Sequence, residues 1–153
     1  MEDSGIVETP PVLYHLDEPE KFGGRVVKFV REWGLDVVFC MNDYYGAATI
    51  RCLSAAGIGV PDDVAVIGFD GLAFGALTLP SLTTVVQPVD ALAERCVEML
   101  FERLETGMPT GVVASELLPP ALHIGGSCGC ADSGGEITLI PQPQLAMLNI
   151  NCL

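Results

Sequence analysis

Asn42, Asp70 and Gln87 each follow a short apolar run that is rich in β-branched residues. If these runs are neighbouring parallel strands, their carboxyl ends meet at one edge of a sheet, where ligands of open α/β folds bind. The three side chains would then surround a common cleft with one carboxylate and two carboxamides. Such groups accept from and donate to hydroxyls in fixed directions, and none of them is an obvious nucleophile. The pattern therefore predicts that the protein recognises a small polyhydroxylated molecule rather than transforming it.

An enzymatic alternative rests on weaker signals. Asp70 acting as a general base would need a second carboxylate in the cleft, and the sequence offers only Asp43. Residues 125–129 match the G-x-S-x-G nucleophile elbow, but the hydrolase triad requires a histidine after that serine, and none follows Ser127. We therefore expect no catalytic residue and no enzymatic activity.

The six cysteines do not form a convincing disulfide framework or metal site. Cys128 and Cys130 make the only cluster, with His123 upstream and Cys152 near the end. Zinc sites commonly take four ligands from two separated pairs, so we expect no metal and no cofactor. Reduced thiols are the default for a chain without an export signal.

Strands and helices alternate along the sequence, with short turns between them. The expected helices cover residues 21–33, 43–56 and 89–106, and the expected strands cover residues 12–14, 37–41, 64–69, 82–86, 112–118 and 122–125. This alternation predicts an α/β fold with a doubly wound, mainly parallel sheet and helices on both faces. The last helix carries a wide apolar stripe, which is typical of a helix that packs on a core.

The chain divides into three parts by composition. Residues 1–11 are a lead-in, residues 12–129 form the predicted ligand-binding lobe, and residues 130–153 are an irregular tail without clear periodicity. A single domain is also what a length of 153 residues favours.

Charge and hydropathy exclude several classes of protein. Seven Lys and Arg residues against 20 Asp and Glu residues give a formal net charge of −13, which repels nucleic-acid phosphates. No apolar run approaches the roughly 20 residues that span a bilayer. The acidic start lacks the basic and apolar parts of a secretion signal. We expect a cytoplasmic protein in which these residues contact neither nucleic acid nor a membrane.

Three stretches, in unbroken order, together form a specific pattern. They are Val38-Phe39-Cys40-Met41-Asn42-Asp43, Pro61-Asp62-Asp63-Val64-Ala65-Val66-Ile67-Gly68-Phe69-Asp70 and Pro80-Ser81-Leu82-Thr83-Thr84-Val85-Val86-Gln87-Pro88. The pattern resembles the effector-binding core of the LacI/GalR family of bacterial transcriptional regulators. This resemblance implies a two-lobed sensor of a small effector, here a carbohydrate, that controls a helix-turn-helix outside this chain. By position, Asn42, Asp70 and Gln87 match effector-contacting sites of the family.

The competing interpretation is a sugar-binding receptor of an ABC-type transporter, which the family resembles in its lobes. The run Leu-Thr-Thr-Val-x-Gln-Pro at residues 82–88 favours the regulators. The absence of a signal peptide also opposes a transport receptor.

The resemblance further implies a homodimer, paired through the helix at residues 43–57 and the segment that follows the second strand. The expected interface residues are Ala47, Ile50, Leu77, Thr78 and Leu79. Exposed apolar patches often mark interaction sites, and twofold pairing would make this patch self-complementary. The alternative is that these side chains simply close the bottom of the core.

Asn42 and Asp43 are both good caps for the helix that follows them. We expect Asp43 to be the cap, which leaves Asn42 for the ligand. For Gln87, an equal alternative is that it satisfies backbone groups beside Pro88.

Overall fold

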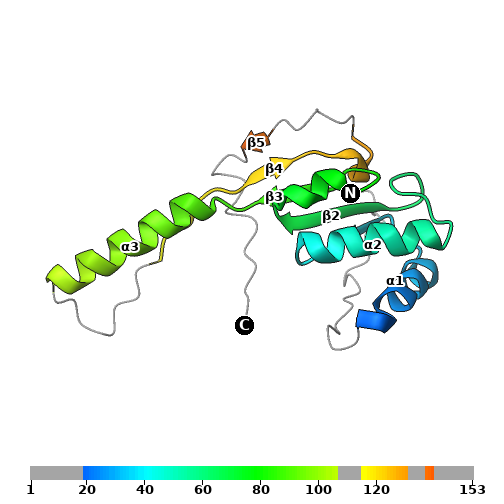
Figure 1. Ribbon diagram of the computed structural model, residues 1–153, viewed down its shortest axis with the longest axis horizontal. Coiled ribbons are helices and arrows are strands. Elements are labelled where there is room, and N and C mark those ends of the chain that lie inside the picture. The colour runs from blue at the N-terminus through cyan, green and yellow to red at the C-terminus, as the bar shows by residue number, and fades with distance from the viewer. Residues whose placement is uncertain (1–18, 107–114, 131–136, 140–153) are drawn as a thin grey trace, which may run out of the picture.

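The computed structural model describes residues 19–106, 115–130 and 137–139 of the chain. These residues form a five-stranded sheet with the order β1-β2-β3-β4-β5 (Figure 1). The strands are β1 (Val37–Phe39), β2 (Ala65–Asp70), β3 (Thr83–Val86), β4 (Ala121–His123) and β5 (Ile137–Leu139). Strands β1, β2 and β3 run parallel, whereas β4 and β5 pair antiparallel. The predicted α/β class is confirmed, and its parallel part is β1 to β3.

The register brings the carboxyl ends of the three parallel strands to one edge of the sheet. Phe39 at the end of β1 pairs with Ile67 in β2, and Asp70 at the end of β2 pairs with Val86 at the end of β3. The polar residues that follow these strands therefore start from the same edge.

Helices α1 (Pro19–Trp33) and α2 (Asp43–Ala55) pack against each other, and α2 packs on β2. Their apolar residues recur at helical spacing and point toward the sheet. The core consists of buried apolar residues from both helices and from the strands and their flanks: Val26, Val30, Cys40, Ile50, Leu53, Val64, Val66 and Leu82.

One face of the sheet is open over the described residues. Val37 and Phe39 of β1 are 50% and 60% exposed, while Val38 between them packs against the core. Because side chains alternate along a strand, α1 and α2 cover the Val38 face and leave the Val37 and Phe39 face uncovered. The described helices α1 and α2 thus share one face of the sheet.

Helix α3 (Val89–Thr106) extends away from the sheet, beyond the carboxyl end of β3 (Figure 1). None of its residues is buried, and Leu100 and Phe101 in its apolar stripe are 56% and 58% exposed. The stripe expected to face a core is therefore uncovered by any described element. Arg95 on the polar side joins α3 to the returning chain, with its Nε 2.7 Å from Oε2 of Glu116.

Four short segments differ from the expectation or fall outside it. Residues 137–139, inside the expected irregular tail, form β5 and pair with β4. Residues 115–118, the described part of an expected strand, are not a strand, and the strand expected at 12–14 lies outside the described residues. The segment between β2 and β3 contains a short 3-10 helix, η1 (Ala73–Leu77).

Within the described ranges, no helix combines the length and apolarity needed to cross a membrane.

Candidate functional site

Asn42 lies just beyond β1 and caps helix α2. Its backbone is extended, with φ −157°, and its side-chain Oδ1 accepts a hydrogen bond from the backbone N–H of Tyr45 at 3.0 Å. This satisfies one of the free N–H groups at the start of the helix. The expectation that Asp43 is the cap is therefore wrong. Asn42 remains partly exposed, and the capping hydrogen bond uses its side-chain Oδ1 and not its side-chain amide nitrogen.

Asp43 is fully buried and joins three segments of the fold. Its Oδ2 accepts from the backbone N–H of Leu72 at 2.5 Å, and its Oδ1 accepts from the hydroxyl of Thr84 at 2.5 Å. A Cβ placed on Gly68 would collide with the same carboxylate, so β2 passes too close for any side chain there. Because Asp43 is enclosed and satisfied, it is not the second carboxylate that an enzymatic use of Asp70 would need.

Asp70 and Gln87 are in direct contact. The amide Nε2 of Gln87 donates to Oδ1 of Asp70 at 2.6 Å, and the backbone N–H of Gln87 lies 3.5 Å from the carbonyl oxygen of Asp70. Both side chains are partly exposed. The contact holds a carboxylate and a carboxamide side by side at the carboxyl edge of β2 and β3.

The backbone at Asp70 is strained. Its φ is 108°, in a region that few residues other than glycine adopt. Such strain costs of order 1–3 kcal/mol and persists where surrounding contacts enforce it, often at ligand sites. The contacts that enforce it here are those from Gln87 and those of the next residue, Gly71.

Gly71 follows Asp70 with φ 77° and lies against β3. A Cβ at this position would be 2.7 Å from Cγ1 and 2.9 Å from Cα of Val86, which leaves room for glycine alone. Its backbone N–H donates to the hydroxyl of Thr84 at 3.3 Å. The turn after β2 is thus fastened to β3, and Asp70 is held at the edge by its neighbours on both sides.

Tyr44 and Tyr45, in the first turn of α2, have different surroundings. The ring of Tyr45 packs on Phe22 of α1, with centroids 5.2 Å apart. The ring of Tyr44 is 68% exposed beside Asn42, so it is the tyrosine of the two that is free to contact a ligand.

Sequence reasoning placed Asn42, Asp70 and Gln87 at a common edge but missed Thr84. Its hydroxyl organises this edge through Asp43 and Gly71. The available signal was a threonine inside an apolar strand, because a buried hydroxyl needs a hydrogen-bond partner.

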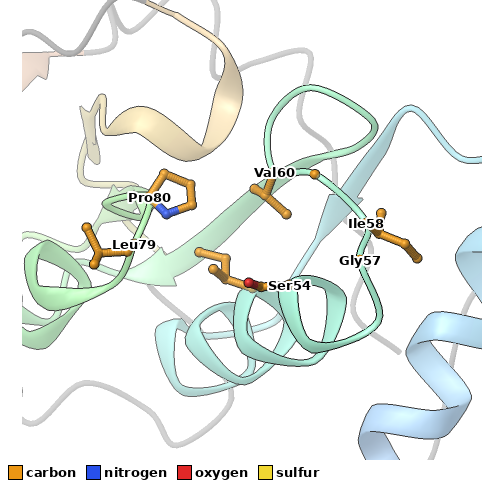
Figure 2. A pocket seen from close by; sticks show the side chains of 8 residues that line it. Ser54, Gly57, Ile58, Val60, Leu79 and Pro80 are labelled. Carbon is orange, nitrogen blue, oxygen red and sulfur yellow. The ribbon is translucent and has the colours of Figure 1, made fainter.

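Two cavities lie near the sheet, and neither is lined by Asn42, Asp70 or Gln87. One of about 260 Å³ lies between η1 and the strands, lined in part by Leu72, Thr84 and His123. The other, of about 350 Å³, lies at the far end of α2, where Ser54 and Val60 face Leu79 and Pro80 (Figure 2). The edge that carries Asp70 and Gln87 lies beside the smaller cavity, because the neighbouring residues Gly71 and Val86 line it.

The residues expected at a dimer interface divide into two groups. Leu77 and Leu79 are 83% and 90% exposed, as a contact surface requires. Thr78 holds the turn between them, with its hydroxyl 2.7 Å from the carbonyl oxygen of Pro80. Ala47 is partly buried, and Ile50 is only 3% exposed because it packs in the core. Ile50 is therefore a core residue in this fold, as in the alternative that these side chains close the bottom of the core.

No group of three or more His, Cys, Asp or Glu side chains in the described part of the chain is arranged to hold a metal ion.

Residues 8–128 match the family described as periplasmic binding protein-like domain. The transcriptional repressor PurR of Pasteurella multocida is 37% identical over 106 residues, which are 68% of this chain and 32% of that protein. The ribose operon repressor of Halalkalibacterium halodurans is 30% identical over 92 residues, which are 60% of this chain and 27% of that protein.

Two of the similar solved structures are complexes of a regulator with a disaccharide. A LacI family transcriptional regulator from Arthrobacter sp. FB24, in complex with lactose, has a TM-score of 0.61 and 30% identity, covering 73% of this chain and 42% of that chain. The complex of the transcriptional regulator CelR with cellobiose has a TM-score of 0.62 and 26% identity, covering 71% of this chain and 33% of that chain. The chain spans less than half the length of each of these relatives.

Proposed function

The chain belongs to the periplasmic binding protein-like domain family, in the form found in LacI-family transcriptional regulators, and from this membership we propose how its lobe senses an effector. Asn42, Asp70 and Gln87 bind a small carbohydrate at the carboxyl edge of β1 to β3. Binding then controls operator recognition by a helix-turn-helix that lies outside these 153 residues. The protein acts in the cytoplasm as a homodimer.

The observation that carries the proposal is the contact between Asp70 and Gln87. A carboxylate and a carboxamide 2.6 Å apart offer acceptors and a donor at the spacing of neighbouring hydroxyls on a sugar ring. The strained backbone of Asp70 adds support, because backbone strain is common where a ligand is held. The exposed ring of Tyr44 adds an apolar surface on which a sugar can stack.

The class of effector is supported by the relatives. The regulator from Arthrobacter sp. FB24 was captured with lactose, and CelR with cellobiose. Both ligands are disaccharides, so a saccharide is the first class to test. The transport-receptor alternative has no comparable support, since the matched curated relatives named above are repressors.

Because ligand pockets bury most of a ligand's surface and Asp70 and Gln87 line neither of the two cavities, we expect the 153-residue chain to bind sugars only weakly. Nuclear magnetic resonance is suited to weak binding, and the side-chain amides of Asn42 and Gln87 give their own signals. Titration with a panel of mono- and disaccharides should shift these two signals first. The sugars should be recovered unchanged, which separates binding from catalysis.

Asp70→Asn is the variant that tests the site, because asparagine tolerates the same backbone region and preserves the shape. We expect at least a tenfold loss of affinity, equivalent to about 1.4 kcal/mol. The matched control is Asp62→Asn, an exposed carboxylate in the turn before β2, which should bind as the wild type does. Equal affinity of the Asp70→Asn variant, or shifts confined to other residues, would refute the site.

The dimer proposal rests on the exposed side chains of Leu77 and Leu79. Replacing Leu77 with Asp should convert a dimer into a folded monomer in sedimentation, because a buried charge without a partner is costly at an interface. Leu117→Asp changes a leucine of similar exposure, 81%, on the segment that returns from α3 and should leave the dimer intact. A wild-type chain that sediments as a monomer at high concentration would contradict the proposal.

A further inference from the structure

Cys128 and Cys130 lie at the far end of the fold's short helix η2 (Gly126–Cys128), separated by one glycine. Both are free thiols; Cys128 is partly buried and Cys130 is exposed. Gly129 alone separates them, and the chain turns at that residue. This pair is not used by the proposed effector site, and its chemistry is that of a dithiol.

Cys128 is held in place by its neighbour Ser127, which is fully buried beneath the sheet. The hydroxyl of Ser127 donates to the carbonyl oxygen of Val66 at 2.6 Å and accepts from the backbone N–H of Thr83 at 2.9 Å. The thiol of Cys128 lies 3.6 Å from the carbonyl oxygen of Gly125. One member of the pair is therefore anchored to β2 and β3, while Cys130 lies on the surface.

Gly129 gives the turn that a bond between the two sulfurs requires. Two fully extended residues span about 7 Å, which is beyond the roughly 4.4–6.8 Å between the Cα atoms of bridged cysteines. Gly129 has φ 77°, a left-handed conformation that folds the chain back and that glycine adopts without strain. The pair is thus presented in a turn and not in an extended segment.

The two thiols differ in reactivity. Burial raises the pKa of Cys128, but hydrogen bonds from Thr83 and from Cys130 outweigh burial and lower it. The hydrogen bond to Cys128 raises the pKa of Cys130. Because the thiolate is the nucleophile, the lowered pKa favours attack by Cys128, and the exposed thiol of Cys130 is then placed to resolve the mixed disulfide.

We propose that Cys128 and Cys130 form a reversible disulfide with each other, by exchange with a small-molecule disulfide such as oxidised glutathione. The Cys128 thiolate attacks one sulfur of oxidised glutathione, forming a mixed disulfide and releasing one glutathione thiolate. The Cys130 sulfur then attacks the Cys128 sulfur, giving the Cys128–Cys130 disulfide and a second glutathione thiolate, and the Cys130 proton passes to solvent. The two cysteines are oxidised by two electrons, and one oxidised glutathione is reduced to two thiols.

The site is distant from the effector edge. A Cβ on Gly126 would lie 3.1 Å from Cβ of Pro80, and one on Gly129 would lie 3.6 Å from Cβ of Pro61. Pro80 and Pro61 precede β3 and β2, so the dithiol lies at the amino ends of these strands, whereas Asp70 lies at the carboxyl end. Oxidation of the two cysteines therefore takes place at a site separate from the effector edge. The proposal does not depend on whether the chain binds a sugar.

Peptide mass spectrometry tests the proposal directly on the full 153-residue chain. Cleavage after glutamate releases residues 117–136, which contain Cys128 and Cys130 and no other cysteine. After treatment with oxidised glutathione and then N-ethylmaleimide, this peptide should be two hydrogen atoms lighter and carry no maleimide. Dithiothreitol should reverse the change.

Variants distinguish the proposed route from incidental oxidation. In Cys130→Ser, glutathione should stay attached to Cys128, because the resolving thiol is gone. Gly129→Ala keeps both thiols but disfavours the turn, and should lower the disulfide yield about tenfold. Cys96→Ser, an exposed cysteine on α3, is the matched control and should leave the reaction unchanged. Circular dichroism of each variant confirms that the fold is retained.

Two results would overturn the proposal. One is a peptide 117–136 in which both cysteines remain open to N-ethylmaleimide after oxidation. The other is a disulfide from Cys128 or Cys130 to Cys152 or to a second chain in place of the internal one.

Discussion

Thr84→Val removes one hydroxyl from a buried polar contact of the lobe. In the wild type this hydroxyl donates to Oδ1 of Asp43 at 2.5 Å and accepts from the backbone N–H of Gly71 at 3.3 Å. Valine has nearly the same shape and suits a strand, so the change creates no cavity and no loss of strand propensity. Its effect on the free energy of unfolding is therefore the effect of the two hydrogen bonds.

The expected loss follows from the burial of the partner. Asp43 is fully buried, and no buried side-chain nitrogen or oxygen in the described residues lacks a partner. A hydrogen bond to a charged group contributes about 1.5–3 kcal/mol, and a longer neutral bond adds about 0.5–1 kcal/mol. We expect Thr84→Val to lower the free energy of unfolding by about 2–4 kcal/mol and the melting temperature by roughly 6–15 °C.

Urea denaturation followed by circular dichroism measures this loss. The midpoint should fall while the slope with denaturant stays the same, since the variant exposes the same amount of surface on unfolding as the wild type does. Thr84→Ser keeps the hydroxyl and should recover most of the difference. Thr106→Val is the control, because that hydroxyl is exposed at the end of α3 and its loss should cost less than about 0.5 kcal/mol.

The reasoning would be refuted by a Thr84→Val variant within 0.5 kcal/mol of the wild type, a margin of about the size that surface substitutions show. It would also be refuted if Thr84→Ser were as unstable as Thr84→Val. Either result would mean that Asp43 does not depend on the hydroxyl for its place under the sheet.

Three further predictions concern other positions. Gly68→Ala should prevent folding or destabilise the lobe severely, because its Cβ collides with the Asp43 carboxylate. Its control is Gly24→Ala, in open space on α1, which should raise the free energy of unfolding by about 0.5–1 kcal/mol in the same denaturation assay. Burial raises the pKa of the Cys40 thiol, so the folded state binds that proton more tightly, and its contribution to stability is lost as pH rises above the ordinary thiol value of roughly 8.5. The stability difference between wild type and Cys40→Ala should therefore shrink with pH above that value and be constant below it. Asp70→Gly should be more stable than Asp70→Ala by about 1–2 kcal/mol, because only glycine relieves the strain at φ 108°; equal midpoints would contradict this.

Most of the strands and helices of the lobe can be predicted from local patterns in the sequence. The apolar runs before Asn42, Asp70 and Gln87 predict three strands, and the helical spacing after Asn42 predicts a crossover connection between the first two. Parallel strands then have their carboxyl ends on one edge, and the register of β2 and β3 agrees. This carboxyl edge could be predicted because it depends on the direction of the strands alone and not on any particular contact.

Other features depended on partners far along the chain. Asn42 and Asp43 are chemically equivalent as caps, and the choice between them was decided by Leu72 and Thr84, which lie 29 and 41 residues from Asp43. Ile50 belongs to the core because α2 turns that side toward β2, although its apolar neighbours suggested a surface patch.

Residue periodicity and chain direction are local properties, and they were enough to predict the α/β class, the parallel strands and the edge on which the polar residues stand. The contact between Asp70 and Gln87, the burial of Asp43 and the extension of α3 from the sheet with its stripe exposed are visible only in the folded chain. These outcomes are set by packing and hydrogen bonding between segments distant in sequence, where the free energy depends on which partners meet and not on residue type alone.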